Sequence, residues 1–269
     1  MEIICLVMMR QLAMRYMALL LQTVFLLCST LLAPGQNGSE RLVTPSSIPT
    51  MPPVIVIGFV GGFVNHDNLV HSAVELAAQL RGDYPSGVYA EVFENRLREK
   101  AHREILRLLD TNHDGTVSAE EKQNAHIIIY GMSWGGSETV ALARELEKEN
   151  IPVALTIQVD SISKIGQSDA VIPANVAEAV NFYQADGLLH GQAKIRAADA
   201  AHTRIIGNFR FDYKANPIKC DKYPWYDRVF ATSHTEIECD PSVWKQVESL
   251  IRAKLPPVTP SRLLPRSHQ

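Results

Sequence analysis

The sequence predicts an α/β fold in which a mostly parallel sheet is flanked by helices. Two observations carry this prediction. Short, continuous, β-branched runs such as VIVIGFV (54–60) and HIIIYGM (126–132) are typical of strands that are buried on both faces. Segments with helical periodicity lie between such runs, and strands that alternate with helices form a parallel sheet. With 269 residues, 46% of them hydrophobic, the chain is long enough to bury a packed core.

The expected elements follow one another through a single domain that spans residues 53–256. The expected strands cover residues 54–60, 87–93, 126–132, 152–160, 179–185 and 203–212. The expected helices cover residues 69–80, 94–109, 137–149 and 241–255. Few residues precede the first buried strand, so a minimal version of such a fold is expected.

Both ends of the chain differ in composition from this domain. Residues 17–33 form an apolar run preceded by arginines, so residues 1–34 are expected to be a secretory signal peptide or an uncleaved N-terminal anchor. Residues 35–52 are expected to be a flexible linker, and residues 257–269 a disordered tail. The protein is therefore expected to be exported, either to the periplasm or out of the cell, and to stay membrane-anchored if the leader is retained.

The net charge bears on the partners of the protein, and the cysteine content bears on its disulfides. The formal net charge of −3 provides no basic field, so no nucleic-acid partner is expected. Two of the four cysteines lie in the leader, which leaves Cys220 and Cys239 in the domain. An even pair in an exported protein predicts one disulfide, and two unpaired buried thiols are the alternative.

A serine stands at the turn between an expected strand and an expected helix. The segment GMSWGG (131–136) places Gly131, Ser133 and Gly135 in the spacing G-x-S-x-G. In a tight strand-to-helix turn this spacing exposes the serine side chain at the carboxyl edge of the sheet, and the glycines provide the room. A glycine-rich turn with an incidental serine is the alternative interpretation.

In this motif and its context, residues 53–255 resemble the α/β-hydrolase superfamily of lipases, esterases and thioesterases. The resemblance implies that Ser133 is the nucleophile of a Ser-His-Asp triad. It also implies an oxyanion hole of backbone N–H groups, one from Trp134 and one from the loop after an early strand, for which GFVGG (58–62) suggests Phe59. No long insertion is present, so any lid is limited to residues 161–173. No organic cofactor is expected.

The family's chain order places the acid, and then the base, after the serine. Asp160 and Asp186 both end expected strands, and Asp160 is the first choice because its strand is more strongly predicted. His234 is the expected base because it lies in a predicted loop between the last strand and the last helix. His190 and His202, in the stretch before the last strand, are weaker candidates.

A second motif, DTNHDGTVSAEE (110–121), has the spacing of an EF-hand calcium loop, within an insertion of about residues 98–125. Calcium prefers hard oxygen ligands, which this spacing wraps around one centre, and Glu121 has two carboxylate oxygens to offer. A polar turn without a metal is the alternative. The expected ligands of a structural Ca²⁺ ion, with Ser118 filling a further position, are Asp110, Asn112, Asp114, Thr116 and Glu121.

Together these features predict a serine hydrolase that cleaves a carboxylic ester or thioester of a small molecule or lipid and is stabilised by calcium. The alternative is an EF-hand calcium-binding protein whose α/β-hydrolase-like domain is not catalytic. An acyltransferase would use the same triad, with an alcohol instead of water resolving the acyl-enzyme. The sequence does not distinguish acyl-chain lengths, because the residues of the pocket come from loops.

Overall fold

The computed structural model describes residues 52–257. The predicted leader, most of the linker and the predicted tail lie outside these residues. Within them, no helix has the length and hydropathy of a membrane-spanning segment.

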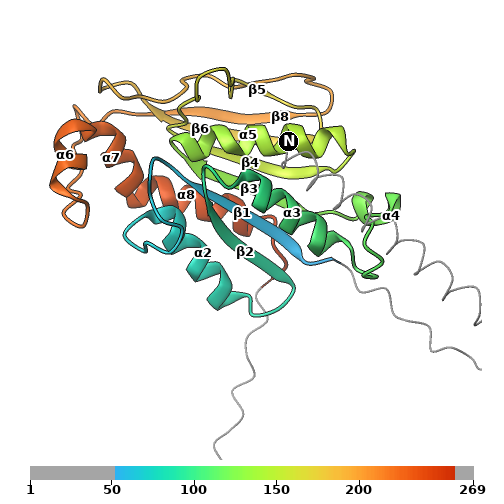
Figure 1. Ribbon diagram of the computed structural model, residues 1–269. Coiled ribbons are helices and arrows are strands. Elements are labelled where there is room, and N and C mark those ends of the chain that lie inside the picture. The colour runs from blue at the N-terminus through green and yellow to red at the C-terminus, as the bar shows by residue number, and fades with distance from the viewer. Residues whose placement is uncertain (1–51, 258–269) are drawn as a thin grey trace, which may run out of the picture. The chain divides into compact units, whose positions relative to one another are not determined.

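Six parallel strands form the central sheet, in the order β2-β1-β3-β4-β6-β8 (Figure 1). The strands are β1 (Val54–Val60), β2 (Val88–Glu94), β3 (Ile127–Met132), β4 (Val153–Val159), β6 (Val176–Gln184) and β8 (Arg204–Phe211). The two remaining strands, β5 (Val171–Ile172) and β7 (Arg196–Ala197), pair in parallel as a small second sheet. The predicted fold class is confirmed, because all six predicted strands are present and every pairing is parallel.

Seven helices are described within residues 52–257. They are α2 (Ser72–Asp83), α3 (Arg98–Leu109), α4 (Ala119–Gln123), α5 (Trp134–Lys148), α6 (Trp225–Phe230), α7 (Thr232–Cys239) and α8 (Pro241–Arg252). The sequence predicted α2, α3, α5 and α8 to within a few residues. The helices α6 and α7 were not predicted, because they are short and carry no clear helical period.

The sheet is buried on both faces, as the continuous apolar strands predict. Alternate side chains of β1 point to opposite faces, so Val56 packs with α2 and α8, whereas Ile57 packs with α3 and α5. Both side chains are fully buried. The domain therefore has three layers, with the sheet between two pairs of helices.

Because all six strands are parallel, their carboxyl ends lie at one edge of the sheet. The loops after the strands and the helices α6 and α7 are at this end, whereas the α3-to-α4 connection is at the opposite end (Figure 1). The serine motif and the predicted calcium loop are thus on opposite sides of the domain.

Candidate active site

Ser133 lies at the turn between β3 and α5, with φ 57° and ψ −125°. Residues other than glycine adopt this backbone conformation only under constraint. The neighbouring glycines explain how the turn is accommodated. A Cβ atom on Gly131 would lie 2.3 Å from the carbonyl oxygen of Gly135, and one on Gly135 would lie 2.3 Å from that of Phe59. Only glycine permits these approaches, which accounts for both glycines of the motif.

The Ser133 side chain lies against the loop that follows β1. A Cβ atom on Gly61 would lie 2.6 Å from Cβ and 3.3 Å from Oγ of Ser133. The backbone of Ser133 is joined to the end of β4, because its N–H donates to the Val159 carbonyl (3.0 Å) and its carbonyl accepts from the Ile162 N–H (3.1 Å). The Ser133 hydroxyl makes no hydrogen bond with any residue of the range 52–257.

Asp160 follows β4 directly and is fully buried. Its carboxylate accepts four hydrogen bonds, from the Gln184 N–H (3.2 Å), Gln184 Nε2 (2.8 Å), the Gly191 N–H (2.9 Å) and His234 Nδ1 (2.7 Å). A carboxylate offers about four acceptor positions, so these donors satisfy it. Neither Gln184 nor Gly191 was predicted from sequence, since neither belongs to a recognisable motif.

His234 lies in the first turn of α7 and not in a loop, which corrects the prediction. The residues Thr, Ser, His and Thr have low helix propensity, so the sequence around His234 reads as a loop. Packing of the fully buried Ile237 in the core overrides that propensity. Since Asp160 only accepts, Nδ1 of His234 is protonated, and Nε2 has no hydrogen-bond partner among the described residues.

Asp186, the second choice for the acid, is used elsewhere. Its carboxylate accepts from the Tyr213 N–H (2.9 Å) and from Arg210 Nη2 (3.3 Å), and it makes no bond to His234. The structure therefore brings Asp160, and not Asp186, together with His234.

The two weaker histidine candidates are both exposed. His190 Nδ1 lies 3.2 Å from the Gly187 carbonyl, and His202 Nδ1 lies 2.8 Å from Asp199 three residues earlier. Neither contacts Asp160, so neither occupies the position that the base requires.

The predicted oxyanion donors differ in their placement. Trp134 is the first residue of α5, where the backbone N–H has no partner within the helix. Phe59, by contrast, lies inside β1, in register with Phe93 and Gly131, and is fully buried. The loop backbone that lies against Ser133 is at Gly61, two residues later than predicted.

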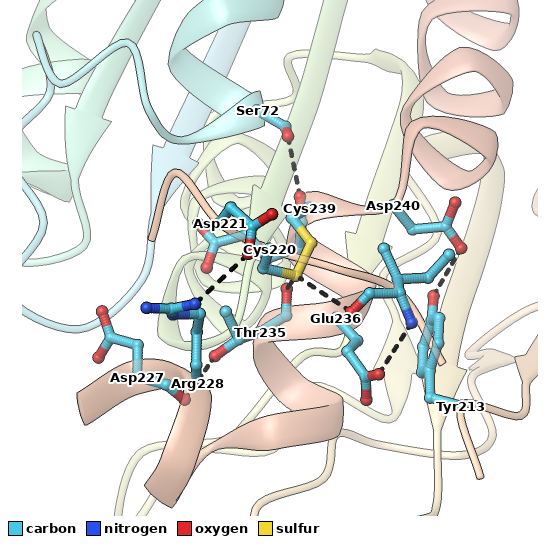
Figure 2. The surroundings of a disulfide bond; sticks show 12 residues. Ser72, Tyr213, Cys220, Asp221, Asp227, Arg228, Thr235, Glu236, Cys239 and Asp240 are labelled. Atoms are coloured by element: carbon cyan, nitrogen blue, oxygen red, sulfur yellow. Dashed lines mark hydrogen bonds and ion pairs between the residues drawn. A yellow bond between two sulfur atoms is a disulfide. The ribbon is translucent and has the colours of Figure 1, made fainter. Parts of the chain in front are cut away.

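A disulfide joins Cys220 to Cys239, with the Cα atoms 5.9 Å apart, which confirms the predicted bridge (Figure 2). The two residues are separated by 19 positions, and the enclosed segment contains α6, α7 and His234. Inside the loop, the Thr235 hydroxyl of α7 donates to the Asp227 carbonyl of α6 (2.9 Å). The bridge closes a loop whose restraint contributes about 3 kcal/mol in the chain-entropy model.

The segment 161–173, predicted as the only room for a lid, is fastened to the domain. The Lys164 ammonium donates to Glu138 (2.7 Å) and to the Asn95 carbonyl (2.9 Å). Glu138 belongs to α5 and is only 1% exposed, and it also binds Arg98 (2.5 Å). This buried network holds the segment against the helix that begins after Ser133.

The predicted calcium loop has the expected turn, with Gly115 at φ 85°. Its first acidic residue, Asp110, accepts from the N–H groups of Asp114 (3.1 Å) and Gly115 (3.0 Å). Its last, Glu121, reaches back to the Thr111 N–H (2.8 Å) and caps α4 through the Ser118 N–H (2.9 Å). Hydrogen bonds from Ser118 and Thr111 lower the pKa of Glu121 to about 2.

The side chains of this loop fit calcium by their chemistry but not by their present arrangement. Asp110, Asn112, Asp114 and Glu121 all offer the hard oxygens that calcium prefers. Within residues 52–257, however, no three His, Cys, Asp or Glu side chains are gathered into a group that would hold a metal ion. Their oxygens accept backbone N–H groups instead, so an ion would have to compete with these bonds.

Four cavities of the described domain lie away from the serine. The largest of these four, about 680 Å³, lies between α2, α8 and the residues around Cys220 and Tyr223. Three further cavities, of about 340, 260 and 200 Å³, also include neither Ser133 nor Asp160 nor His234 among their lining residues. Ser133 and His234 are each 8% exposed and Asp160 is fully buried, so only a small part of these side chains reaches solvent.

No protein-family model and no curated protein match the sequence. Among solved structures, the chain is similar to an acetylxylan esterase, with 14% identity, a TM-score of 0.38, and 77% of this chain and 100% of that chain covered. It is also similar to a cutinase-like protein from Cryptococcus sp., with 12% identity, a TM-score of 0.37, and 76% and 95% covered. An arylesterase shares 12% identity with a TM-score of 0.29, and the chain covers 40% of its length, with 44% of this chain matched. Function is therefore inferred from the geometry of the site alone.

Proposed function

We propose that the protein is a serine hydrolase that cleaves a carboxylic ester or thioester through Ser133, His234 and Asp160. One observation carries the proposal. The backbone turn that presents Ser133 is hydrogen-bonded to the end of β4, where the fully buried Asp160 binds His234 Nδ1 at 2.7 Å. An acid that fixes the histidine tautomer, beside a serine on a constrained turn, is the arrangement that nucleophilic acyl transfer requires.

The reaction follows from these positions. Nε2 of His234 takes the proton of the Ser133 hydroxyl as Oγ attacks the carbonyl carbon of the ester. The protonated imidazole then donates this proton to the leaving oxygen or sulfur as its bond to carbon breaks, which leaves an acyl group on Ser133. Water, activated by the same Nε2, hydrolyses the acyl-enzyme. Asp160 stabilises the imidazolium throughout.

The Ser133 hydroxyl and the imidazole are not hydrogen-bonded in this structure. Catalytic hydrogen bonds are often long in free enzymes and shorten when substrate binds, so this arrangement is compatible with the proposed roles.

The negative charge of the tetrahedral intermediate needs N–H donors beside Ser133. We propose the Trp134 N–H as one donor. We propose that the second comes from the loop after β1 rather than from Phe59, since Gly61 lies against Ser133. The N–H groups of Gly62 and Phe63 donate to no described residue, so they are the candidates for this second donor.

Labelling with a fluorophosphonate probe tests this proposal directly. The wild-type chain should be labelled once, and the Ser133→Ala variant not at all. A Ser137→Ala variant is the matched control, because Ser137 lies one turn later in α5 and donates to the Trp134 carbonyl. Hydrolysis of p-nitrophenyl esters from acetate to palmitate then gives the acyl-chain preference, and added alcohol distinguishes hydrolysis from acyl transfer.

We further propose that residues 110–121 bind a structural calcium ion through Asp110, Asn112, Asp114, Thr116 and Glu121. The oxygen-rich loop, the positive φ of Gly115 and the closure of the loop by Glu121 support this. The ion would neutralise the carboxylates and hold α3 to α4, at the end of the domain away from Ser133.

Thermal unfolding with calcium or EGTA tests the calcium proposal. At a calcium concentration of 100 times Kd, binding should stabilise the domain by about 2.7 kcal/mol. The Glu121→Gln variant should lose the response. Glu120→Gln is the control, because Glu120 is exposed beside it in α4. An equal melting temperature in calcium and EGTA would contradict the proposal.

We also propose that the chain is exported. The Cys220–Cys239 disulfide supports this, since disulfides form and persist mainly in oxidising compartments. Fractionation of cells that express the full chain would test it.

A further inference from the structure

Large apolar side chains are exposed around the end of the sheet where Ser133 lies. Within residues 52–257 they fall on the loops after β1, β4 and β6 and on α6, and Phe209 on β8 is the exception. Six of them, between 51% and 106% exposed, are here named the apolar rim: Phe63, Ile165, Leu188, Trp225, Tyr226 and Val229. Single exposed apolar residues are common on proteins, whereas several gathered around one site indicate a docking surface.

Two contacts fasten the loops that carry Phe63 and Ile165 to the first part of α5, the helix that begins after Ser133. The Phe63 ring lies edge to face with the ring of Trp134, the residue after the serine, at a centroid distance of 6.0 Å. Lys164, the residue before Ile165, donates to Glu138 of α5 (2.7 Å). The loops after β1 and β4 are therefore both fastened next to the turn that carries Ser133.

The remaining members of the apolar rim lie beside the acid and the base. Leu188 belongs to the loop after β6, in which the Gly191 N–H donates to Asp160 (2.9 Å). Trp225, Tyr226 and Val229 belong to α6, whose Asp227 carbonyl accepts from Thr235 of α7, one residue after the proposed base. The loops after β1, β4 and β6 and the helix α6, which support the segments of the triad, thus expose apolar side chains.

Lys and Arg side chains lie close in sequence to Trp225 and Tyr226, the aromatic residues of the apolar rim on α6. Residues 214–229 contain four Lys or Arg and two Asp, although the whole chain has a formal net charge of −3. Lys222 and Arg228 are exposed and flank Trp225 and Tyr226 in sequence. Trp and Tyr are enriched where proteins meet the interface of a lipid bilayer, and adjacent cations favour anionic headgroups.

We infer that the apolar rim docks onto a lipid bilayer that contains anionic phospholipid, so that the substrate is an acyl ester presented at this surface. The substrate assignment rests on the proposed hydrolase function. An ester group at the bilayer surface reaches Ser133 while its acyl chain contacts the rim.

A kinetic comparison tests this inference on the full chain. The substrates are p-nitrophenyl palmitate in vesicles of ether-linked phosphatidylcholine and phosphatidylglycerol, and p-nitrophenyl acetate in solution. In the Ile165→Ser and Leu188→Ser double variant, the rate on vesicles should fall about tenfold or more, because two apolar anchors are lost. The rate on dissolved acetate should change by less than about twofold.

Phe209→Ser is the matched control, because Phe209 is exposed but belongs to β8 and not to the apolar rim. It should leave the ratio of the two rates unchanged. All variants retain residues 17–33, so any membrane attachment by that apolar run is the same in each.

A second experiment needs no activity. In a Ser133→Ala chain, vesicles with brominated acyl chains should quench the fluorescence of Trp225, and the quenching should grow with the phosphatidylglycerol content. A Trp225→Phe variant should lose most of the quenching, since Trp244 is buried and Trp134 is only partly exposed.

The outcomes separate the two proposals. Quenching without hydrolysis of either ester would retain the docking surface and refute the hydrolase. Hydrolysis of the soluble ester without quenching, or with equal vesicle rates for the double variant and the wild type, would overturn the docking inference. Rim variants that dissociate a dimer in sedimentation would also overturn it, in favour of a second copy of the chain.

Discussion

Replacement of Asp160 by Asn isolates the role of the proposed acid. Asp160 is fully buried and surrounded by four donors, from Gln184, Gly191 and His234. An Asn side chain has one acceptor and one donor group, so its NH₂ must face at least one of these donors. The buried mismatch should lower the free energy of unfolding by about 1 to 3 kcal/mol.

The catalytic effect should be larger than the effect on stability. Asn in place of Asp160 removes the charge that stabilises the imidazolium and favours the tautomer protonated at Nε2, which cannot accept the Ser133 proton. The corresponding change in the chymotrypsin-like triad lowers kcat about 10⁴-fold. We expect a loss of similar order, measured as kcat on a soluble p-nitrophenyl ester at a temperature where both proteins are folded.

Asp186→Asn is the matched control, since Asp186 also follows a strand closely and its carboxylate accepts, among the described residues, from Tyr213 and Arg210 alone. It should change kcat by less than about threefold. If Asp186→Asn abolished activity while Asp160→Asn retained it, the assignment of the acid would be wrong.

Three further changes test other parts of the account. Gly61→Ala places a Cβ atom 2.6 Å from Ser133 Cβ and should lower kcat about 10²-fold by displacing the nucleophile. Replacing both Cys220 and Cys239 by Ser should lower the free energy of unfolding by about 3 kcal/mol in urea titrations. The pKa of Glu121 is lowered from the ordinary 4.5 to about 2, so its ionised carboxylate stabilises the folded chain. In EGTA, the melting temperature of the wild type should exceed that of Glu121→Gln by a constant amount above pH 4.5. This difference should be lost as the pH falls toward 2.

Controls and contrary results are available for each of the three. Gly82→Ala should leave kcat unchanged, because a Cβ atom there meets nothing within 4 Å, and equal activity of Gly61→Ala would show that Gly61 does not border the nucleophile. An unchanged urea midpoint without the disulfide would contradict its role as a restraint. If the difference in melting temperature between the wild type and Glu121→Gln grew as the pH fell, the sign of the pKa argument would be contradicted.

Much of the fold was predictable because the strands are continuous apolar runs. The predicted strand 54–60 agrees with β1, since a fully buried parallel strand leaves a pattern that depends little on its neighbours. The segment around α6 and α7 was not predictable in the same way. Its helices are stabilised by the Cys220–Cys239 bridge and by contacts between elements, which local propensity does not encode.

The site was predicted where a local motif fixed the geometry. Ser133 follows from the glycine spacing, because the turn needs those glycines. The sequence ranked Asp160 above Asp186 on the strength of its strand alone. The structure decides between them, because the choice depends on which carboxylate reaches His234. The hydrogen bonds from Gln184 to Asp160 could not be predicted, because a glutamine at a strand end belongs to no motif that indicates its partner.

The oxyanion loop shows a further limit of the sequence. The strand 54–60 and the glycines after it were predicted, but the donor was assigned to Phe59 inside that strand, whereas the backbone beside Ser133 is that of Gly61. Which loop residue lies next to the serine depends on how the loop folds back onto the turn, and local sequence does not encode that contact.

Fluorophosphonate labelling of the wild-type chain and the Ser133→Ala variant, read by mass spectrometry of the modified peptide, tests the central claim most directly. The account predicts one adduct on Ser133 in the wild type, none in the variant, and loss of ester hydrolysis in the same proportion. Ester hydrolysis that persisted in Ser133→Ala, or a folded wild type that neither took the label nor hydrolysed any ester, would contradict it.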